Sequence, residues 1–436
     1  MNAHAFRPAA ALLLCAALAG CGKSASSSSS ASDGPIAQVS SAGAGGLSTK
    51  NTTRLGGSDP ATDAAAVARA VYPGLTSGTR PRAVVLVDEQ DWPAALIASV
   101  LASAPLGAPL LYSEGPALPA VSSQALAAMH PSGDGQAGGA QVIRIGAAST
   151  LPAAPTGYRT RTLTAGDPPA LAVAVARLAG ATHGVAPRQV IVLSEQVPPA
   201  LAMPAAGLSA ESGAPILLVS STRIPAATRA ELAGLHRPAI YLIGPSTLHD
   251  HVLAALARLG SVKPIGGGSE AEAGTDGNGA GGNGASGNGA GGAGGNPIQN
   301  AIAIARFADG SFGWGIHEPG HGLVFVNPTR PLDAPAAASL SANGDFGPLL
   351  LLGASGPSVP DAVAGAAISP ALAAYLSDIK PAYSPQVPPV RSVYNHGWLI
   401  GDEQAISAVT QAEIDSLLEI SPSATATEEP SLPLAE

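Results

Sequence analysis

The segment of this sequence closest to a catalytic motif is His317-Glu318-Pro319-Gly320-His321, which matches the His-Glu-x-x-His pattern of zinc metalloproteases. That chemistry needs both histidines on one face of a helix, one turn apart, with the glutamate as general base. Proline and glycine inside the motif oppose a helix. We therefore predict a turn at 317–321 and no zinc site.

Other patterns that could support chemistry are also incomplete. His249 and His251 flank Asp250, which is placed to cap a helix at 250–259, so we interpret them as exposed histidines beside a cap. No Gly-x-Ser-x-Gly segment follows an apolar run, and no Gly-x-Gly-x-x-Gly segment joins a strand to a helix. The glycine tract at 266–296 lacks both the Gly-Lys-Ser/Thr ending of a phosphate loop and repeated calcium ligands. The sequence predicts a protein that is not an enzyme and holds no metal or cofactor.

Arginine side chains are the better candidates for binding. Arg159 and Arg161 lie close together in the sequence, and Arg223 lies in another basic stretch. Guanidinium groups suit the phosphate or carboxylate groups of an anionic polymer. The net charge of -9 excludes a globally basic nucleic-acid binder. We hypothesise that some of the clustered arginines line a groove between subdomains, and Arg159, Arg161 and Arg223 are the candidates for contact with the polymer.

These residues are carried by a pattern that occurs three times. Each copy has an apolar run, an alanine-rich segment opened by proline, a second apolar run and a third run, which ends in Ile-Gly. Continuous apolar runs are typical of strands covered on both faces, and their alternation with helices predicts parallel pairing. We find no polar constellation that recurs in the same place, which argues against catalysis. The predicted strands are 83–87, 108–112, 141–145, 189–193, 215–219, 239–243, 323–326, 349–352 and 393–400.

Helical segments are expected at 59–71, 169–179, 250–259 and 298–307, and a capping box at 410–413 predicts a final helix. The predicted fold class is α/β, with three tandem Rossmann-like or flavodoxin-like subdomains that have parallel sheets and a pseudo-threefold arrangement. The predicted divisions are repeat 1 at 51–151, repeat 2 at 158–265, a Gly-rich linker at 266–296, a divergent repeat 3 at 297–420 and a disordered tail at 421–436.

The N-terminus predicts the location. Residues 1–21 have a cationic start and a short apolar run, as in a secretory signal peptide. Leu18-Ala19-Gly20-Cys21 resembles a bacterial lipobox, which implies a lipid on Cys21 and anchoring on the extracytoplasmic face of the membrane. Residues 22–50 form a Ser/Gly-rich segment that predicts a disordered tether. Both cysteines lie before this tether, so the folded body has no disulfide or thiolate chemistry.

Three recurring segments carry a family resemblance. An Arg-x-x-Gly segment, Arg54-Leu55-Gly56-Gly57, precedes the first alanine-rich helix. A central block pairs a proline-alanine segment with an Ala-Pro-Leu-Leu-like run, and Gly401 opens a closing Gly-x-x-x-Ala-Ile-Ser segment. The central blocks are Pro93-Ala94-Ala95-Leu96 with Ala108-Pro109-Leu110-Leu111, Pro199-Ala200-Leu201 with Ala214-Pro215-Ile216-Leu217-Leu218, and Leu332-Asp333-Ala334 with Gly347-Pro348-Leu349-Leu350.

In these features the chain resembles the cell wall-binding repeat family of bacterial surface proteins, whose members usually carry three tandem copies. The resemblance implies three α/β subdomains that hold a surface protein to an anionic wall polymer or a peptidoglycan-associated glycan. It also makes Arg54 a candidate ligand contact. The alternative is a solute-binding lipoprotein of a transporter, but three copies and only 3% aromatic residues argue against two ligand-clamping lobes.

Overall fold

The computed structural model describes residues 47–266, 295–353, 366–383 and 394–422. The predicted signal peptide with Cys21, the tether up to residue 46, most of the Gly-rich linker and the tail from residue 423 lie outside the described residues. No helix within the described ranges combines the length and the apolar character needed to cross a bilayer.

The predicted fold class is confirmed, because the chain forms three α/β units that each contain a four-stranded parallel sheet. The first sheet has the order β3-β2-β4-β5, the second β7-β6-β8-β9 and the third β1-β13-β10-β11. The strands of the first sheet are β2 (Val84–Asp88), β3 (Leu110–Ser113), β4 (Val142–Ile145) and β5 (Thr160–Leu163). Those of the second are β6 (Gln189–Ser194), β7 (Ile216–Val219), β8 (Ala239–Ile243) and β9 (Ser261–Ile265). Those of the third are β1 (Thr52–Leu55), β10 (Gly322–Val326), β11 (Leu349–Leu351) and β13 (His396–Ile400).

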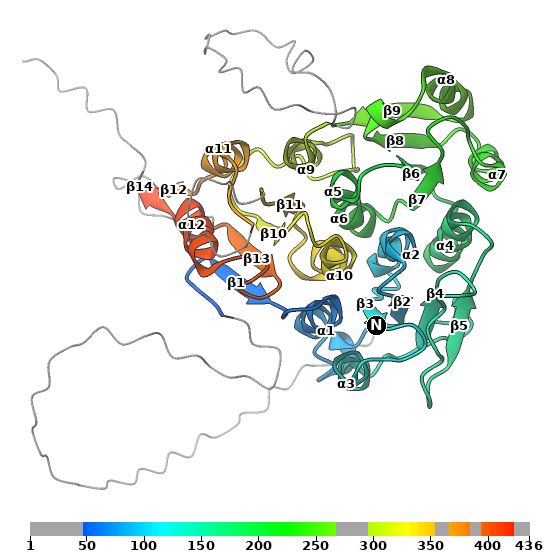
Figure 1. Cartoon of the computed structure of the whole chain (residues 1–436), viewed down its shortest axis with the longest axis horizontal. Helices are drawn as coiled ribbons and strands as arrows, with labels where there is room; N and C mark the ends of the chain where they lie inside the picture. The colour runs from blue at the N-terminus through cyan, green and yellow to red at the C-terminus, as the bar shows by residue number, and fades with distance from the viewer. Residues whose placement is uncertain (1–46, 267–294, 354–365, 384–393, 423–436) are drawn as a thin grey trace, which may run out of the picture. The chain divides into compact units, whose positions relative to one another are not determined.

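The opening strand of the chain belongs to the last sheet. β1 pairs in parallel with β13, with Arg54 opposite Leu399, and Figure 1 shows the blue strand alongside the orange one. In the same way, β5 follows β4 into the first sheet and β9 follows β8 into the second. The fourth strand of each sheet therefore comes from the segment that leads into the first helix of the following unit. β1 does the same for the third sheet, because it leads into the first helix of the chain. A further pair, β12 (Ala382–Tyr383) with β14 (Ser421–Pro422), lies outside the three sheets.

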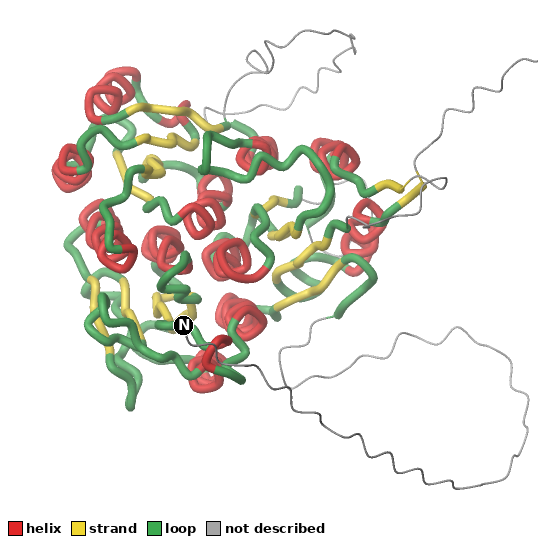
Figure 2. The backbone as a smooth tube through the Cα atoms, turned by 180° about the vertical axis from the view of Figure 1, so that it is seen from behind, coloured by secondary structure: helices red, strands yellow, loops and turns green. Residues whose placement is uncertain are grey.

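Helices connect the strands and cover both faces of the sheets (Figure 2). Three of them, which we call the opening helices, begin with proline after a side-chain cap from Asp59, Asp167 or Asn296. These are α1 (Pro60–Val71), α4 (Pro168–His183) and α9 (Pro297–Arg306). The other helices are α2 (Trp92–Ala98), α3 (Ala120–Met129), α5 (Pro199–Ala202), α6 (Pro204–Ser212), α7 (Ala226–Gly234), α8 (Asp250–Leu259), α10 (Asp333–Ser339), α11 (Pro370–Asp378) and α12 (Ala408–Leu418).

Two predicted helix caps were wrong. Asp250 is the first residue of α8, and His249 precedes it without a side-chain cap. The last helix is capped by Ser407, whose hydroxyl accepts a hydrogen bond from the Thr410 N–H at 3.1 Å, so it begins earlier than the predicted box. Serine is a preferred N-cap residue, and its hydroxyl provides a partner for the Thr410 N–H, which has none within the first turn of the helix.

The helices join the three units in a repeated way. α10 contacts both α2 and α6, and each opening helix packs against a helix of the preceding unit. We call these contacts the α1–α10, α2–α4 and α5–α9 junctions. Alanines of the contacting helices are fully buried, such as Ala94 in α2, Ala205 in α6 and Ala337 in α10, and their small side chains let the helices approach closely. The contact pattern closes on itself, as expected for a pseudo-threefold arrangement.

Candidate ligand site

Arg54 is part of the folded framework. Its residue is 5% exposed. Its Nη1 donates to the carbonyl oxygens of Gly401 and Asp402, at 3.1 and 2.7 Å. Its Nε and Nη2 donate to Gln411 Oε1 at 3.1 and 2.9 Å. Burial lowers the pKa of this guanidinium. Arg54 therefore fixes β1 against α12 and the turn after β13, and its donors are used inside the protein.

The other predicted arginines remain accessible. Arg159 is exposed just before β5, and Arg161 lies two residues further along, on the same face of this edge strand. Arg161 Nη1 donates to the Gln136 carbonyl at 3.4 Å, and the Arg159 side chain covers Gly139. Arg223 is exposed in the turn after β7, in the second sheet. The structure thus brings Arg159 and Arg161 together and places Arg223 on a different unit.

The zinc-like motif forms a loop, as predicted. Residues 317–321 precede β10 without helical structure. Asn395 Oδ1 accepts hydrogen bonds from the N–H groups of Gly320 and His321, at 2.8 and 3.1 Å. Burial lowers the pKa of His321. Among the described residues, no group of three or more His, Cys, Asp or Glu side chains is positioned to hold a metal ion.

A cavity of about 380 Å³ lies at the α2–α4 junction, and we call it the Trp92 pocket. It opens beside the carboxyl end of β6, which is where open α/β sheets place ligands. Leu96 and Leu218 are buried side chains that line it. The half-buried Trp92 and a set of rigid rings add further apolar surface. These rings belong to Pro93, Pro168, Pro198 and Pro199.

Two polar side chains line the same pocket next to each other. Gln196 Oε1 accepts hydrogen bonds from the Ser221 N–H at 2.8 Å and the Ser194 hydroxyl at 3.1 Å. Its amide orientation is therefore fixed, and its Nε2 donates to none of the described residues. Glu195 is exposed. Burial raises the pKa of Glu195, nearby Asp167 raises it further, and Arg223 opposes both. The rim of the pocket presents a fixed N–H donor beside a carboxylate acceptor.

This pair corrects one of our predictions. Glu195-Gln196 directly follows β6, and Glu89-Gln90 directly follows β2, so a polar pair does recur in the same place in two copies. In the third copy the place is taken by Pro328-Thr329. The recurrence was readable in the sequence from the strings VLVDEQ and IVLSEQ. We missed it because glutamate and glutamine at a strand end are common surface residues.

The α1–α10 junction is closed by charged residues instead. Arg330 forms ion pairs with Asp63 and with Asp333 Oδ2, the latter at 2.9 Å, and both aspartate side chains are fully buried. Asp63 also accepts a hydrogen bond from the Gly57 N–H at 2.6 Å. Burial raises the pKa of Asp63 to about 6, although the positive charge of Arg330 lowers it. Burial and the neighbouring Asp63 raise the pKa of Asp333 well above its usual range.

The fourth residue of each opening helix distinguishes the three junctions. It is Asp63 in α1, Leu171 in α4 and Asn300 in α9. Asn300 Nδ2 donates to the Leu201 carbonyl at 2.9 Å, whereas Leu171 is a buried apolar residue. The same helix position therefore carries an acidic, an apolar or an amide side chain in the three units. The Trp92 pocket lies at the α2–α4 junction, where this residue is the apolar Leu171.

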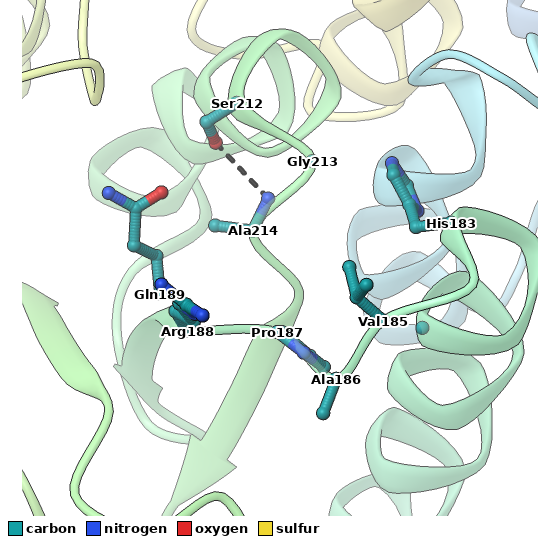
Figure 3. A pocket seen from close by; sticks show the side chains of 10 residues that line it. His183, Val185, Ala186, Pro187, Arg188, Gln189, Ser212, Gly213 and Ala214 are labelled. Atoms are coloured by element: carbon teal, nitrogen blue, oxygen red, sulfur yellow. Dashed lines mark hydrogen bonds between the residues drawn. The ribbon is translucent and has the colours of Figure 1, made fainter.

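A second, more open cavity of about 290 Å³ lies at the other end of the second sheet, between the C-termini of α4 and α6. Figure 3 shows His183 and Val185 on one side, with Ser212 and Ala214 across from them. His183 Nδ1 lies 2.7 Å from the Ala179 carbonyl oxygen, so one ring nitrogen is engaged within its own helix. This cavity lies at the amino ends of β6 and β7, whereas open α/β sheets bind ligands at the carboxyl ends of their strands, so it is the weaker candidate for a ligand site.

Comparison with known proteins supports the fold. No family model matches the chain, and no curated protein sequence matches it either. One solved structure similar to it is Cwp6 from Clostridium difficile, with a TM-score of 0.61 and 15% sequence identity. The similarity covers 85% of this chain and 48% of Cwp6, so this chain spans about half the length of that protein. At this identity the similarity shows a shared fold.

Proposed function

We propose that this chain is a non-enzymatic, lipid-anchored protein of the cell envelope that binds an anionic wall polymer. The observation that carries the proposal is the set of three parallel α/β units, in an arrangement similar to that of Cwp6, a cell wall protein. The lipobox-like Cys21 supports lipid anchoring, and the triplicated segments support a wall-binding body.

The accessible arginines are the proposed contacts with the anionic groups of the polymer. Arg159, Arg161 and Arg223 form no ion pair with any described residue. Arg161 uses its Nη1 on the Gln136 carbonyl, and the other guanidinium donors of these residues are available for phosphate or carboxylate oxygens. Arg54 is not proposed as a contact, because its donors already bind Gly401, Asp402 and Gln411.

The experiment is retention of the full chain on isolated cell walls, with anionic polymers either intact or chemically removed. Replacing Arg159, Arg161 and Arg223 together with alanine is expected to lower retention severalfold, and added salt is expected to lower retention of the parent chain. Arg258→Ala is the matched control, because Arg258 is an exposed arginine on α8. Equal retention of the triple variant and the parent would remove these arginines from the proposal. Equal retention on stripped walls would remove the anionic polymer.

A further inference from the structure

We propose that the Trp92 pocket binds one neutral sugar ring of the wall polymer, with two of its hydroxyl groups held by Glu195 and Gln196. This inference rests on the proposed function and assigns a second kind of contact to it. The arginines would hold the anionic groups, whereas this pocket would recognise a sugar.

The shape and lining of the pocket indicate an amphipathic ring. A volume of about 380 Å³ has room for a single ring rather than a long segment. The indole of Trp92 and the rings of Pro93, Pro198 and Pro199 supply rigid apolar surface that needs little ordering when a ligand binds. A sugar ring has apolar C–H faces and a hydroxyl edge, so it can use both the apolar surface and the polar rim.

The polar rim favours hydroxyl groups. The Glu195 carboxylate can only accept hydrogen bonds, and the Gln196 amide nitrogen can only donate them. A hydroxyl group both donates and accepts, so two hydroxyls can satisfy this pair. The Gln196 amide is already fixed by Ser194 and Ser221, so little side-chain freedom is lost on binding.

The charges around the pocket disfavour an anion inside it. Glu195 lines the pocket, and Asp167 lies close enough to raise the pKa of Glu195. An added phosphate would be repelled by these carboxylates. Arg223 acts on Glu195 from the turn after β7, so an anionic group next to the bound sugar could reach this arginine.

The test uses the full chain in mild detergent on an array of neutral and phosphorylated glycans. The best neutral ligand is then titrated by calorimetry, with inorganic phosphate and leucine as the comparison ligands. We expect saturable binding of a neutral glycan. Gln196→Ala is expected to weaken it about fivefold, as for one lost hydrogen bond. Trp92→Ala is expected to weaken it about tenfold or more.

Gln90→Ala is the matched control, because Gln90 is the counterpart of Gln196 in the first copy and does not line the Trp92 pocket. This variant should bind like the parent chain. Thermal unfolding identifies a variant that has lost its fold. If Trp92→Ala does not fold, the test of the pocket relies on Gln196→Ala. The proposal is overturned by binding of phosphate or leucine only, by no neutral glycan binding, or by equal binding in Gln196→Ala and the parent. Wall retention of the same variants separates the two proposals. If retention falls when the arginines are replaced but not when Trp92 or Gln196 is replaced, the sugar site is contradicted and the proposed function stands.

Discussion

The buried Asp63–Arg330–Asp333 cluster predicts that the α1–α10 junction weakens as pH rises. Both aspartate side chains are fully buried and share one arginine, which is itself 19% exposed. Two buried carboxylates next to a single cation cannot both ionise without cost. We therefore choose Asp333→Asn as the perturbation. Asparagine keeps an oxygen for the Arg330 Nε donor and removes the second ionisable group.

The sign of the pH dependence follows from Asp63. Its folded-state pKa of about 6 lies above its ordinary value of 3.8, so the folded state binds more protons than the unfolded state between these values. The corresponding stability is present below about pH 4 and is lost as pH rises through about 6. A rise from 3.8 to about 6 corresponds to about 3 kcal/mol. Asp333 adds its own loss of stability with rising pH, because burial and Asp63 raise its folded-state pKa well above 3.8. In Asp333→Asn this second contribution is absent, so the total loss between the two pH values should shrink, and the variant should be about 1–3 kcal/mol more stable than the parent at pH 7.5.

The assay is urea unfolding at pH 4.5 and pH 7.5, followed by circular dichroism. Arg330→Met is the opposite perturbation, because it leaves both carboxyl groups without a cation. It should destabilise the protein by about 3–5 kcal/mol at pH 7.5 and by less at pH 4.5. Asp345→Asn is the control, because burial also raises the pKa of Asp345 to about 6 but Asp345 lies outside the cluster. It measures how much of the pH dependence comes from a buried acid that does not share Arg330. If Asp333→Asn loses as much stability as the parent between the two pH values, the reasoning about this junction is wrong.

Two further predictions concern the start of the chain. Arg54→Ala should lower the free energy of unfolding by about 2–3 kcal/mol, because it leaves the carbonyls of Gly401 and Asp402 and the Gln411 oxygen without their donor. Wall retention per folded molecule should stay unchanged, and a retention loss without a stability loss would contradict the structural role of Arg54. Cys21→Ser should move the protein from the detergent phase to the aqueous phase in a phase-partition assay, and continued detergent partitioning would contradict lipid anchoring at this cysteine.

The sequence predicted three strands of each sheet and missed the fourth. Every predicted strand range overlaps a strand of the structure, because strands such as β2 and β6 are continuous apolar runs. In contrast, β1 reads Thr-Thr-Arg-Leu and β5 reads Thr-Arg-Thr-Leu. Both lie at sheet edges, and unlike the apolar edge strands β3, β7 and β11 they consist mainly of polar residues, which give no continuous apolar run. No local pattern could reveal that β1 joins β13, since that pairing depends on the packing of the whole chain.

The candidate site was less predictable than the fold. Arg54 was selected because it opens the first copy, but its partners Gly401 and Gln411 lie near the other end of the sequence and use its donors. The Trp92 pocket combines residues of α2, α4 and the segment after β6. Its apolar members look like ordinary core residues in the sequence. The Glu195-Gln196 pair could have been found, because Glu89-Gln90 repeats it at the same distance from a buried strand.

Comparison of two junctions explains why the Trp92 pocket lies where it does. At the α1–α10 junction, the long Arg330 side chain forms ion pairs with Asp63 in α1 and Asp333 in α10, and so links the two helices. At the α2–α4 junction, the matching positions of the two aspartates carry Leu171 and Ala94, which cannot form such a bridge. Asp91, in the place of Arg330, accepts hydrogen bonds from the Ala94 N–H and the Thr150 hydroxyl. It thereby caps its own helix instead of crossing to the next one. The three units share one arrangement of helices and sheet, and a cavity is present at the junction where these few positions carry no buried charged side chain.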